Sequence, residues 1–96
     1  MEKKQHAWGW YSSDIDKSRK VKIREIHVNP YVNDYLKYMS NKTEKWDVIE
    51  GSAILETKDG TPSEVKKGDY VMFTEEVLYN VKGGPNGITL REIKGY

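Results

Sequence analysis

Short runs of β-branched and aromatic residues make up most of the chain, and glycine, proline, asparagine and aspartate separate them at fairly even spacing. Nowhere do apolar residues recur at three- and four-residue intervals over the length of an ordinary helix. Such runs predict β-strands joined by turns. We therefore expect an all-β protein with about nine short strands and no helix.

One of the expected strands changes the face on which its apolar residues lie. Val21 and Ile23 share one face, whereas Ile26 and Val28 share the other. The change predicts either a β-bulge or a strand that is buried on both faces. Turns or loops are expected at 12–14, 29–30, 51, 59–60 and 67–69, and a hairpin loop at 83–87. The expected strands are 7–11, 20–28, 33–39, 45–50, 52–58, 61–66, 70–74, 77–82 and 88–94.

The length of 96 residues allows one domain, which we expect to span 1–96 with its core at about 7–94. Only 36% of the residues are hydrophobic, so the core has to be thin. A small domain with many strands has to cover its strand edges. It does so by closing into a barrel or by packing two sheets as a jelly roll.

The charge balance limits the classes of partner. Lys and Arg number 16 and Asp and Glu 15, which leaves a formal net charge of +1. This balance argues against binding a nucleic-acid polymer or an anionic membrane. The absence of cysteine excludes disulfides, thiolate metal sites and a cysteine nucleophile. No apolar run reaches the length of a membrane span, and no signal-peptide pattern follows Met1, so we expect a cytoplasmic protein.

A local basic stretch precedes and enters the second expected strand. It contains Lys17, Arg19, Lys20, Lys22 and Arg24. Charged runs of this kind usually face water. We therefore expect a solvated loop followed by the outer face of a strand, with a phosphate-binding patch as the alternative.

Three segments carry a resemblance to a known family. They are Trp8-Gly9-Trp10-Tyr11, Glu44-Lys45-Trp46-Asp47-Val48-Ile49-Glu50-Gly51 and Lys67-Gly68-Asp69-Tyr70-Val71-Met72-Phe73. Through these segments the chain resembles a cupin, in particular the small cupin domain of bacterial type II mannose-6-phosphate isomerases that are fused to a mannose-1-phosphate guanylyltransferase. The resemblance covers nearly the whole chain. It implies a single-domain cupin-type jelly-roll β-barrel.

Cupins hold a metal through two motifs in which histidines, a glutamate and glycines keep a set spacing. Laid on this sequence, the first motif places its glutamate on Glu44 and its two histidines on Lys37 and Met39. The second motif begins at Gly68 and places its histidine on Tyr79. The spacings survive, whereas every imidazole that the resemblance implies is replaced.

These replacements remove the donors that a divalent transition metal needs, namely neutral imidazole nitrogens beside a carboxylate. Lys37 carries an ammonium without a lone pair, Met39 a soft thioether and Tyr79 a phenol. The two histidines, His6 and His27, lie outside both motifs. We therefore expect no metal and no other cofactor, which argues against a metal-dependent isomerase, oxygenase or epimerase.

The strand phases predict which side chains line the interior. Lys37 would supply a positive charge there, and a lysine in a barrel interior is unfavourable unless an anion meets it. With hydroxyl groups and an aromatic wall, such an interior suits a sugar phosphate, a nucleotide or a nucleotide-like signal. The candidate ligand-binding residues are Tyr35, Lys37, Met39, Glu44, Trp46 and Tyr79.

Three hypotheses of function remain open. The first is a metal-free cupin that binds a small anionic molecule without turnover, as a sensor or a sequestering protein. The second is a metal-independent isomerase or epimerase of sugars or sugar nucleotides, with Glu44 and Tyr79 as proton-transfer groups. The third is a filled barrel, in which Lys37 and Glu44 form a pair and the protein is a structural or interaction module.

Aromatic and aliphatic residues also predict self-association. If they lie on the outer surface, they form an apolar patch that is too large for a monomer this polar, and we expect a homodimer. The residues of this predicted patch are Trp8, Trp10, Tyr11, Leu36, Tyr38 and Ile49.

Overall fold

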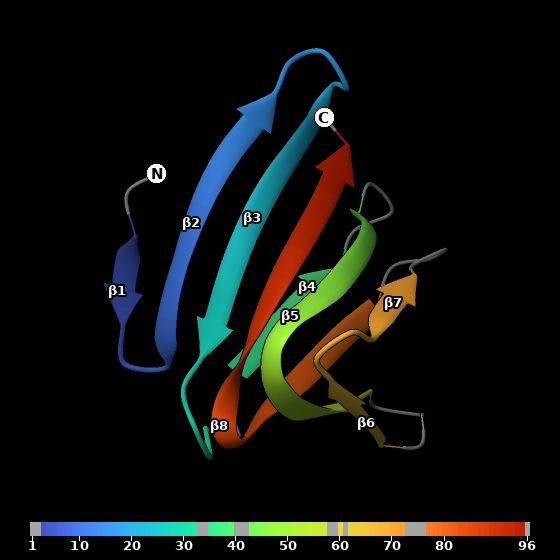
Figure 1. Cartoon of the computed structure of the whole chain (residues 1–96). Helices are drawn as coiled ribbons and strands as arrows, with labels where there is room; N and C mark the ends of the chain where they lie inside the picture. Colours follow the sequence, from blue (N-terminus) through green and yellow to red (C-terminus); the bar gives the residue numbers. More distant parts are fainter. Residues whose placement is uncertain are drawn as a thin grey trace.

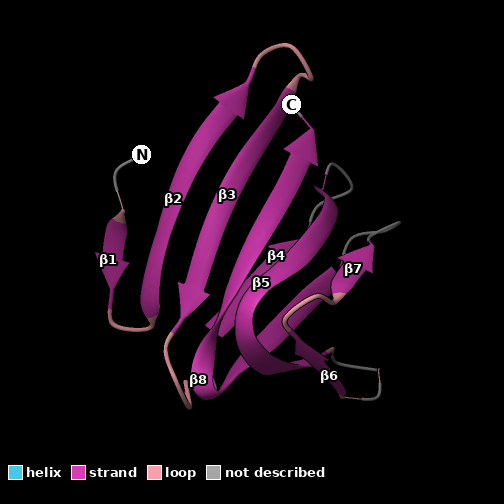
Figure 2. Cartoon of the chain, in the orientation of Figure 1, coloured by secondary structure: helices cyan, strands magenta, loops and turns pink. Residues whose placement is uncertain are grey.

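The computed structural model describes residues 3–32, 35–39, 43–57, 60, 62–72 and 77–95, and it gives only the backbone path of residues 35–39, 43, 44, 77 and 78. All regular structure in the described part of the chain is β-strand (Figure 2), which confirms the predicted all-β class. The strands are β1 Lys4–His6, β2 Gly9–Asp16, β3 Val21–Val28, β4 Tyr35–Met39, β5 Thr43–Glu56, β6 Ser63–Lys66, β7 Tyr70–Met72 and β8 Val77–Gly95.

Two long strands, β5 and β8, hold the fold together. The strand order is β1-β2-β3-β8-β5-β6, with β4 added on β8 and β7 on β5. The second half of β8 pairs with β3, whereas its first half pairs with β4. Both halves pair with β5, which is bent in the same way (Figure 1). The result is two layers that share β5 and β8, as in a jelly roll.

Glycines occupy the place where β5 and β8 pass from one layer to the other. Gly51 and Gly87 have φ angles of 77° and 72°, in the left-handed region that favours glycine. A Cβ on Gly51 would overlap the carbonyl oxygen of Gly87. The register of the β5–β8 pair also shifts between Gly51 and Ala53. The two backbones therefore meet at a corner that only glycine can form.

The prediction of a hairpin loop at 83–87 is wrong. Residues 77–82 and 88–94 do not pair with each other, because each pairs with a different half of β5. The glycines of this segment bend β8 through the corner and do not reverse the chain. Gly51 has the same role in β5, where the sequence predicted a break between two strands.

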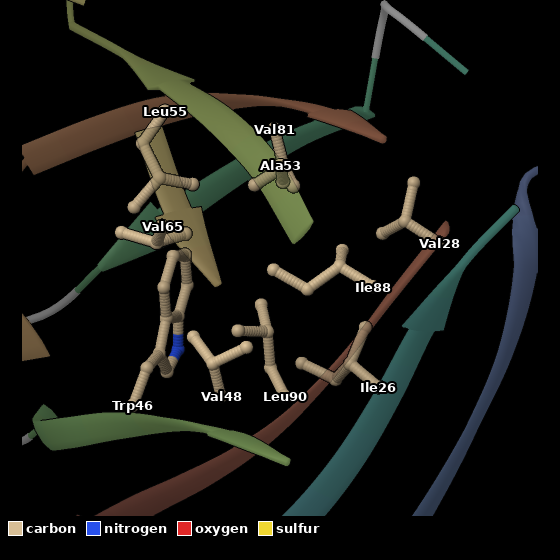
Figure 3. Close-up of a cluster of buried hydrophobic side chains, with 10 residues drawn as sticks. All are labelled: Ile26, Val28, Trp46, Val48, Ala53, Leu55, Val65, Val81, Ile88 and Leu90. Carbon is tan, nitrogen blue, oxygen red and sulfur yellow. The ribbon is translucent and has the colours of Figure 1, made fainter. Parts of the chain in front are cut away.

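The core lies between the two layers (Figure 3). Trp46 is its largest member and is fully buried. Partly buried rings and valines surround the cluster, among them Trp8, Tyr11 and Tyr79. The buried residues are Ile26, Val28, Trp46, Val48, Ala53, Leu55, Val65, Val81, Ile88 and Leu90.

Strand β3 carries apolar residues on both of its faces. Its register with β2 and with β8 runs without a shift from Val21 to Val28, so the strand has no bulge. Ile26 and Val28 belong to the core cluster, whereas Val21 is buried outside it. Of the two explanations for the phase change, burial on both faces is therefore the one that the structure supports.

The first hairpin differs from the prediction. Residues 12–14, expected as a loop, lie inside β2 and pair with β3, and Ser12 is buried. The turn falls at 17–20, where the carboxylate of Asp16 accepts hydrogen bonds from the Ser18 hydroxyl at 2.7 Å and from the backbone of Ser18 and Arg19. The Ser18 hydroxyl is the main cause of the lowered pKa of Asp16.

The predicted outer patch is divided between two faces of the sheet. Trp8 and Tyr11 pack against the core. Trp10 lies one residue away from Tyr11 and therefore on the opposite face. The side chains of Leu36 and Tyr38, like the predicted turn residue Asp59, lie outside the described residues. The homodimer stays a prediction.

No helix in the described ranges is long and apolar enough to cross a membrane.

We predict that Gly51→Ala destabilises the fold much more than Gly68→Ala. Both glycines have a positive φ, so each substitution should lose about 1 kcal/mol to backbone strain. A Cβ at Gly68 meets nothing within 4 Å, whereas one at Gly51 meets the backbone of Gly87. Urea unfolding should therefore show an additional loss of about 1–3 kcal/mol for Gly51→Ala. Equal losses of unfolding free energy in the two variants would show that the close backbone approach at Gly51 does not limit stability.

Candidate functional site

The register of β2, β3, β8 and β5 arranges the inner side chains of one layer in rows. Alternation along each strand places every second residue on this inner face. The two inner rows nearest the corner are apolar, and the next two carry charge. The third inner row holds Ser13, Arg24, Glu92 and Trp46. The fourth holds Ile15, Lys22 and Lys94, and the backbone of Thr43 on β5 lies opposite Lys94.

A buried hydrogen bond joins two members of the third row. The indole nitrogen of Trp46 donates to Oε2 of Glu92 at 2.9 Å, and Glu92 is only 3% exposed. A buried carboxylate needs donors of this kind, because burial takes away its hydration. The ring of Tyr79 lies 5.7 Å from that of Trp46, tilted by 52°. Trp46 thus belongs to the core and positions Glu92.

Arg24 lies directly opposite Glu92 in the register of β3 and β8. Its side chain is half-buried, with Cζ 5.2 Å from the centroid of the Tyr11 ring. Within the described part of the chain, the buried Nε of Arg24 has no hydrogen-bond partner. The carboxylate across the row accepts a hydrogen bond from Trp46. The guanidinium is therefore held in place by an aromatic face and has a hydrogen-bond donor to spare.

The ring of Tyr11 also belongs to a group of stacked rings. The imidazole of His6 stacks on Tyr11 at 5.4 Å and on Trp8 at 5.0 Å, with interplanar angles of 11° and 6°. The segment that carries the first part of the cupin resemblance therefore positions Arg24 through Tyr11.

The predicted residues on β4 are placed only through their backbone. Lys37 lies opposite Tyr79 in the register, and Tyr35 lies opposite Val81. Residues directly opposite one another share a face of an antiparallel sheet. The side chains of Tyr35, Lys37 and Met39, and that of Glu44 on β5, lie outside the described residues. Their roles in ligand binding stay predictions.

The residues that would form the cupin metal site do not fit a metal. Lys37 and Tyr79 face each other in the register where ligands would be needed, and neither is an imidazole. His27 lies on the opposite face of β3 from Arg24, with its Nδ1 2.9 Å from Oγ1 of Thr89. Over the described ranges, no three histidine, aspartate or glutamate residues gather as a set that could hold an ion. We derive no chemistry through a metal.

Two residues of this site were missed by the sequence analysis. Arg24 was expected on an outer strand face, and this prediction is wrong: the side chain lies inside, in phase with Ile26 and Val28. Glu92 was not singled out, although it alternates with Ile88 and Leu90. Side chains alternate between the two faces of a strand, and this alternation with the apolar residues of β3 and β8 could have identified both residues.

Trp46→Phe should destabilise the protein by about 2 kcal/mol, because it removes the donor of a hydrogen bond to a buried carboxylate. Trp10→Phe is the matched control, since Trp10 is half-buried and lies on the other face of the layer. We expect a smaller loss there, measured by urea unfolding. Losses of equal size would contradict the role of the Trp46 indole.

His27 gives a prediction for pH dependence. Burial, and to a lesser degree the ammonium of Lys3, lowers the pKa of His27 below its ordinary value. Between the two values the unfolded chain binds more protons than the folded one, so the free energy of unfolding should fall as the pH falls through this window. His27→Asn should remove this part of the pH dependence, measured by urea unfolding from about pH 7.5 down to about pH 5. An unchanged slope would show that His27 does not contribute.

Comparison with solved structures shows the same fold in proteins of different activity. A mutant of oxalate decarboxylase OxdC from Bacillus subtilis superposes with a TM-score of 0.80 at 14% identity, over 98% of this chain and 27% of OxdC. The cupin domain of Cnp3 from Schizosaccharomyces pombe has a TM-score of 0.75 at 9% identity, over 100% of this chain and 69% of that domain's chain. DMSP lyase DddQ from Ruegeria pomeroyi has a TM-score of 0.74 at 10% identity, over 90% of this chain and 46% of DddQ.

At these identities the likeness shows the fold alone. The chain spans less than half the length of OxdC and of DddQ. A search of the curated proteins found no match. The family model described as mannose-6-phosphate isomerase C-terminal matches residues 1–94. Because the match covers nearly the whole chain, the protein belongs to this family, and its jelly roll is that of a cupin.

Proposed function

We propose that this cupin binds a small anionic molecule inside the jelly roll, without a metal and without turnover, as a cytoplasmic sensor or sequestering protein. The ligand class is a sugar phosphate, a nucleotide or a nucleotide-like signal. Arg24 receives the anion, with Lys37 on β4 as a second cation.

One observation carries the proposal: Arg24 points into the interior with a buried Nε that has no hydrogen-bond partner in the described part of the chain. A buried donor without a partner costs about 1–3 kcal/mol. A fold keeps such a group when it serves something other than stability. A guanidinium binds planar and tetrahedral oxoanions through two parallel hydrogen bonds, and a small rotation would bring Nε into such a pair.

The comparisons support the ligand class in a general way. The family is named after an enzyme of a phosphorylated sugar, and OxdC is named after a small dicarboxylate. In both names the small molecule is an anion.

The enzymatic alternative requires Glu44 and Tyr79 to exchange protons with the ligand. It would be favoured by turnover of a bound sugar phosphate that is lost in Glu44→Gln.

The proposal is tested by thermal-shift measurements with glucose 6-phosphate and AMP, with glucose and adenosine as the uncharged counterparts. We expect the anions to raise Tm and the neutral compounds to leave it unchanged. Arg24→Met should abolish the rise. In the absence of ligand the variant should be as stable as the original, or about 1 kcal/mol more stable, since the unpaired donor is gone.

Arg91→Met is the matched control. Arg91 pairs with Glu25 at 3.4 Å on the outer face, one residue along β8 from Glu92, and its loss should leave anion binding intact. A Tm rise that survives Arg24→Met would contradict the proposal. A fold that no anion stabilises, together with a gain in stability in Lys37→Met, would favour the filled-barrel module.

A further inference from the structure

The fourth inner row places two lysines at one register position. Lys22 on β3 lies directly opposite Lys94 on β8, and both are half-buried. Ile15, which is 49% exposed, completes the row on β2. Alternation places the row on the same face as Arg24, one step nearer the β2–β3 turn. Figure 1 shows the end of β8 beside the start of β3 at this edge of the layer.

These two charges lie side by side on the sheet. Like charges directly opposite one another destabilise an antiparallel pair. Three other lysines have carboxylate partners: Lys45 pairs with Asp47, Lys67 with Glu50 and Lys82 with Glu56. Within the described residues, neither Lys22 nor Lys94 forms a salt bridge. In the same part of the chain, the buried Nε of Arg24, one row away, also has no hydrogen-bond partner.

The charge of the inner face therefore increases outward from the corner. The two rows nearest the corner are uncharged, the third holds Arg24 and Glu92 with no net charge, and the fourth holds two positive charges. Residues two apart in a strand are separated by about 7 Å, which is the step from Arg24 to Lys22. This spacing gives room for two oxoanions side by side, one at each cationic position.

We infer that the fourth row is a second anion position of the same site. The ligand then carries at least two oxoanion groups and is a bisphosphorylated small molecule, either a sugar bisphosphate or a dinucleotide. One oxoanion binds Arg24, and the other binds between Lys22 and Lys94. This inference rests on the proposed function and names its ligand class more closely.

A nucleic-acid polymer fits this face less well. The whole chain carries a net charge of only +1. A polymer needs a cationic surface several phosphates long. Among the described side chains of this face, the cationic positions are confined to two adjacent rows.

The test compares matched ligands by titration calorimetry at constant ionic strength. Fructose 1,6-bisphosphate is measured against fructose 6-phosphate, and the dinucleotide pApA against AMP, which separates the sugar source from the nucleotide source. In at least one pair we expect the bisphosphorylated compound to bind about tenfold more tightly. The double variant Lys22→Met/Lys94→Met should reduce this preference to about twofold and keep the binding of the monophosphate.

Lys17→Met is the control for general surface charge, because Lys17 is exposed in the adjacent turn. It should keep the preference. The inference is overturned if neither pair shows a preference for the bisphosphorylated compound, or if the preference survives in the double variant. In either case the proposed function then rests on Arg24 alone. Loss of the preference in Lys17→Met as well also overturns it. Monophosphate binding that survives Arg24→Met contradicts the proposed function instead. Tighter binding of a single-stranded 20-nucleotide RNA than of pApA would favour a polymer partner.

Discussion

The close approach of the backbones at Gly51 and Gly87 is the constraint on which the other features depend. At this point β5 and β8 leave one layer and enter the other, and the distance between them leaves no room for a side chain. Because both strands bend together, each half of β8 stays paired with β5 while it gains a second neighbour, β3 or β4. The pairing of Trp46 with Glu92 and the alignment of Arg24 opposite Glu92 follow from the same register.

The interior combines an apolar end with a charged end, and the two contribute differently to stability. The rows near the corner supply the burial that a chain with only 36% hydrophobic residues can provide. The rows farther out hold groups that lower stability, namely a donor for which the described residues supply no partner and two lysines at one register position. A stability optimum would replace these groups with apolar residues. Under the proposed function, these groups are retained because they bind the ligand.

The sequence predicted the fold class, the family resemblance and most strand positions, because these depend on local patterns and on motif spacing. It failed where pairing decides the outcome. Residues 12–14 have the composition of a loop but lie in β2, since β3 offers a partner for each of them. The glycines at 83–87 have the composition of a hairpin, and only the pairing of both flanks with β5 shows a corner. Arg24 follows several basic residues in the sequence, which suggests an exposed face. Its alternation with Ile26 and Val28 instead places it on the inner face.

The central position of β8 has a consequence for the synthesis of the protein. β8 pairs with β3, β4 and β5, and it comes last among the described strands. On the ribosome, the earlier strands therefore remain without their common neighbour until residue 95 has left the exit tunnel. Folding of such long-range pairings is slow, and unpaired strand edges invite association with other chains. Chaperone engagement of the nascent chain is thus expected to end only when β8 emerges.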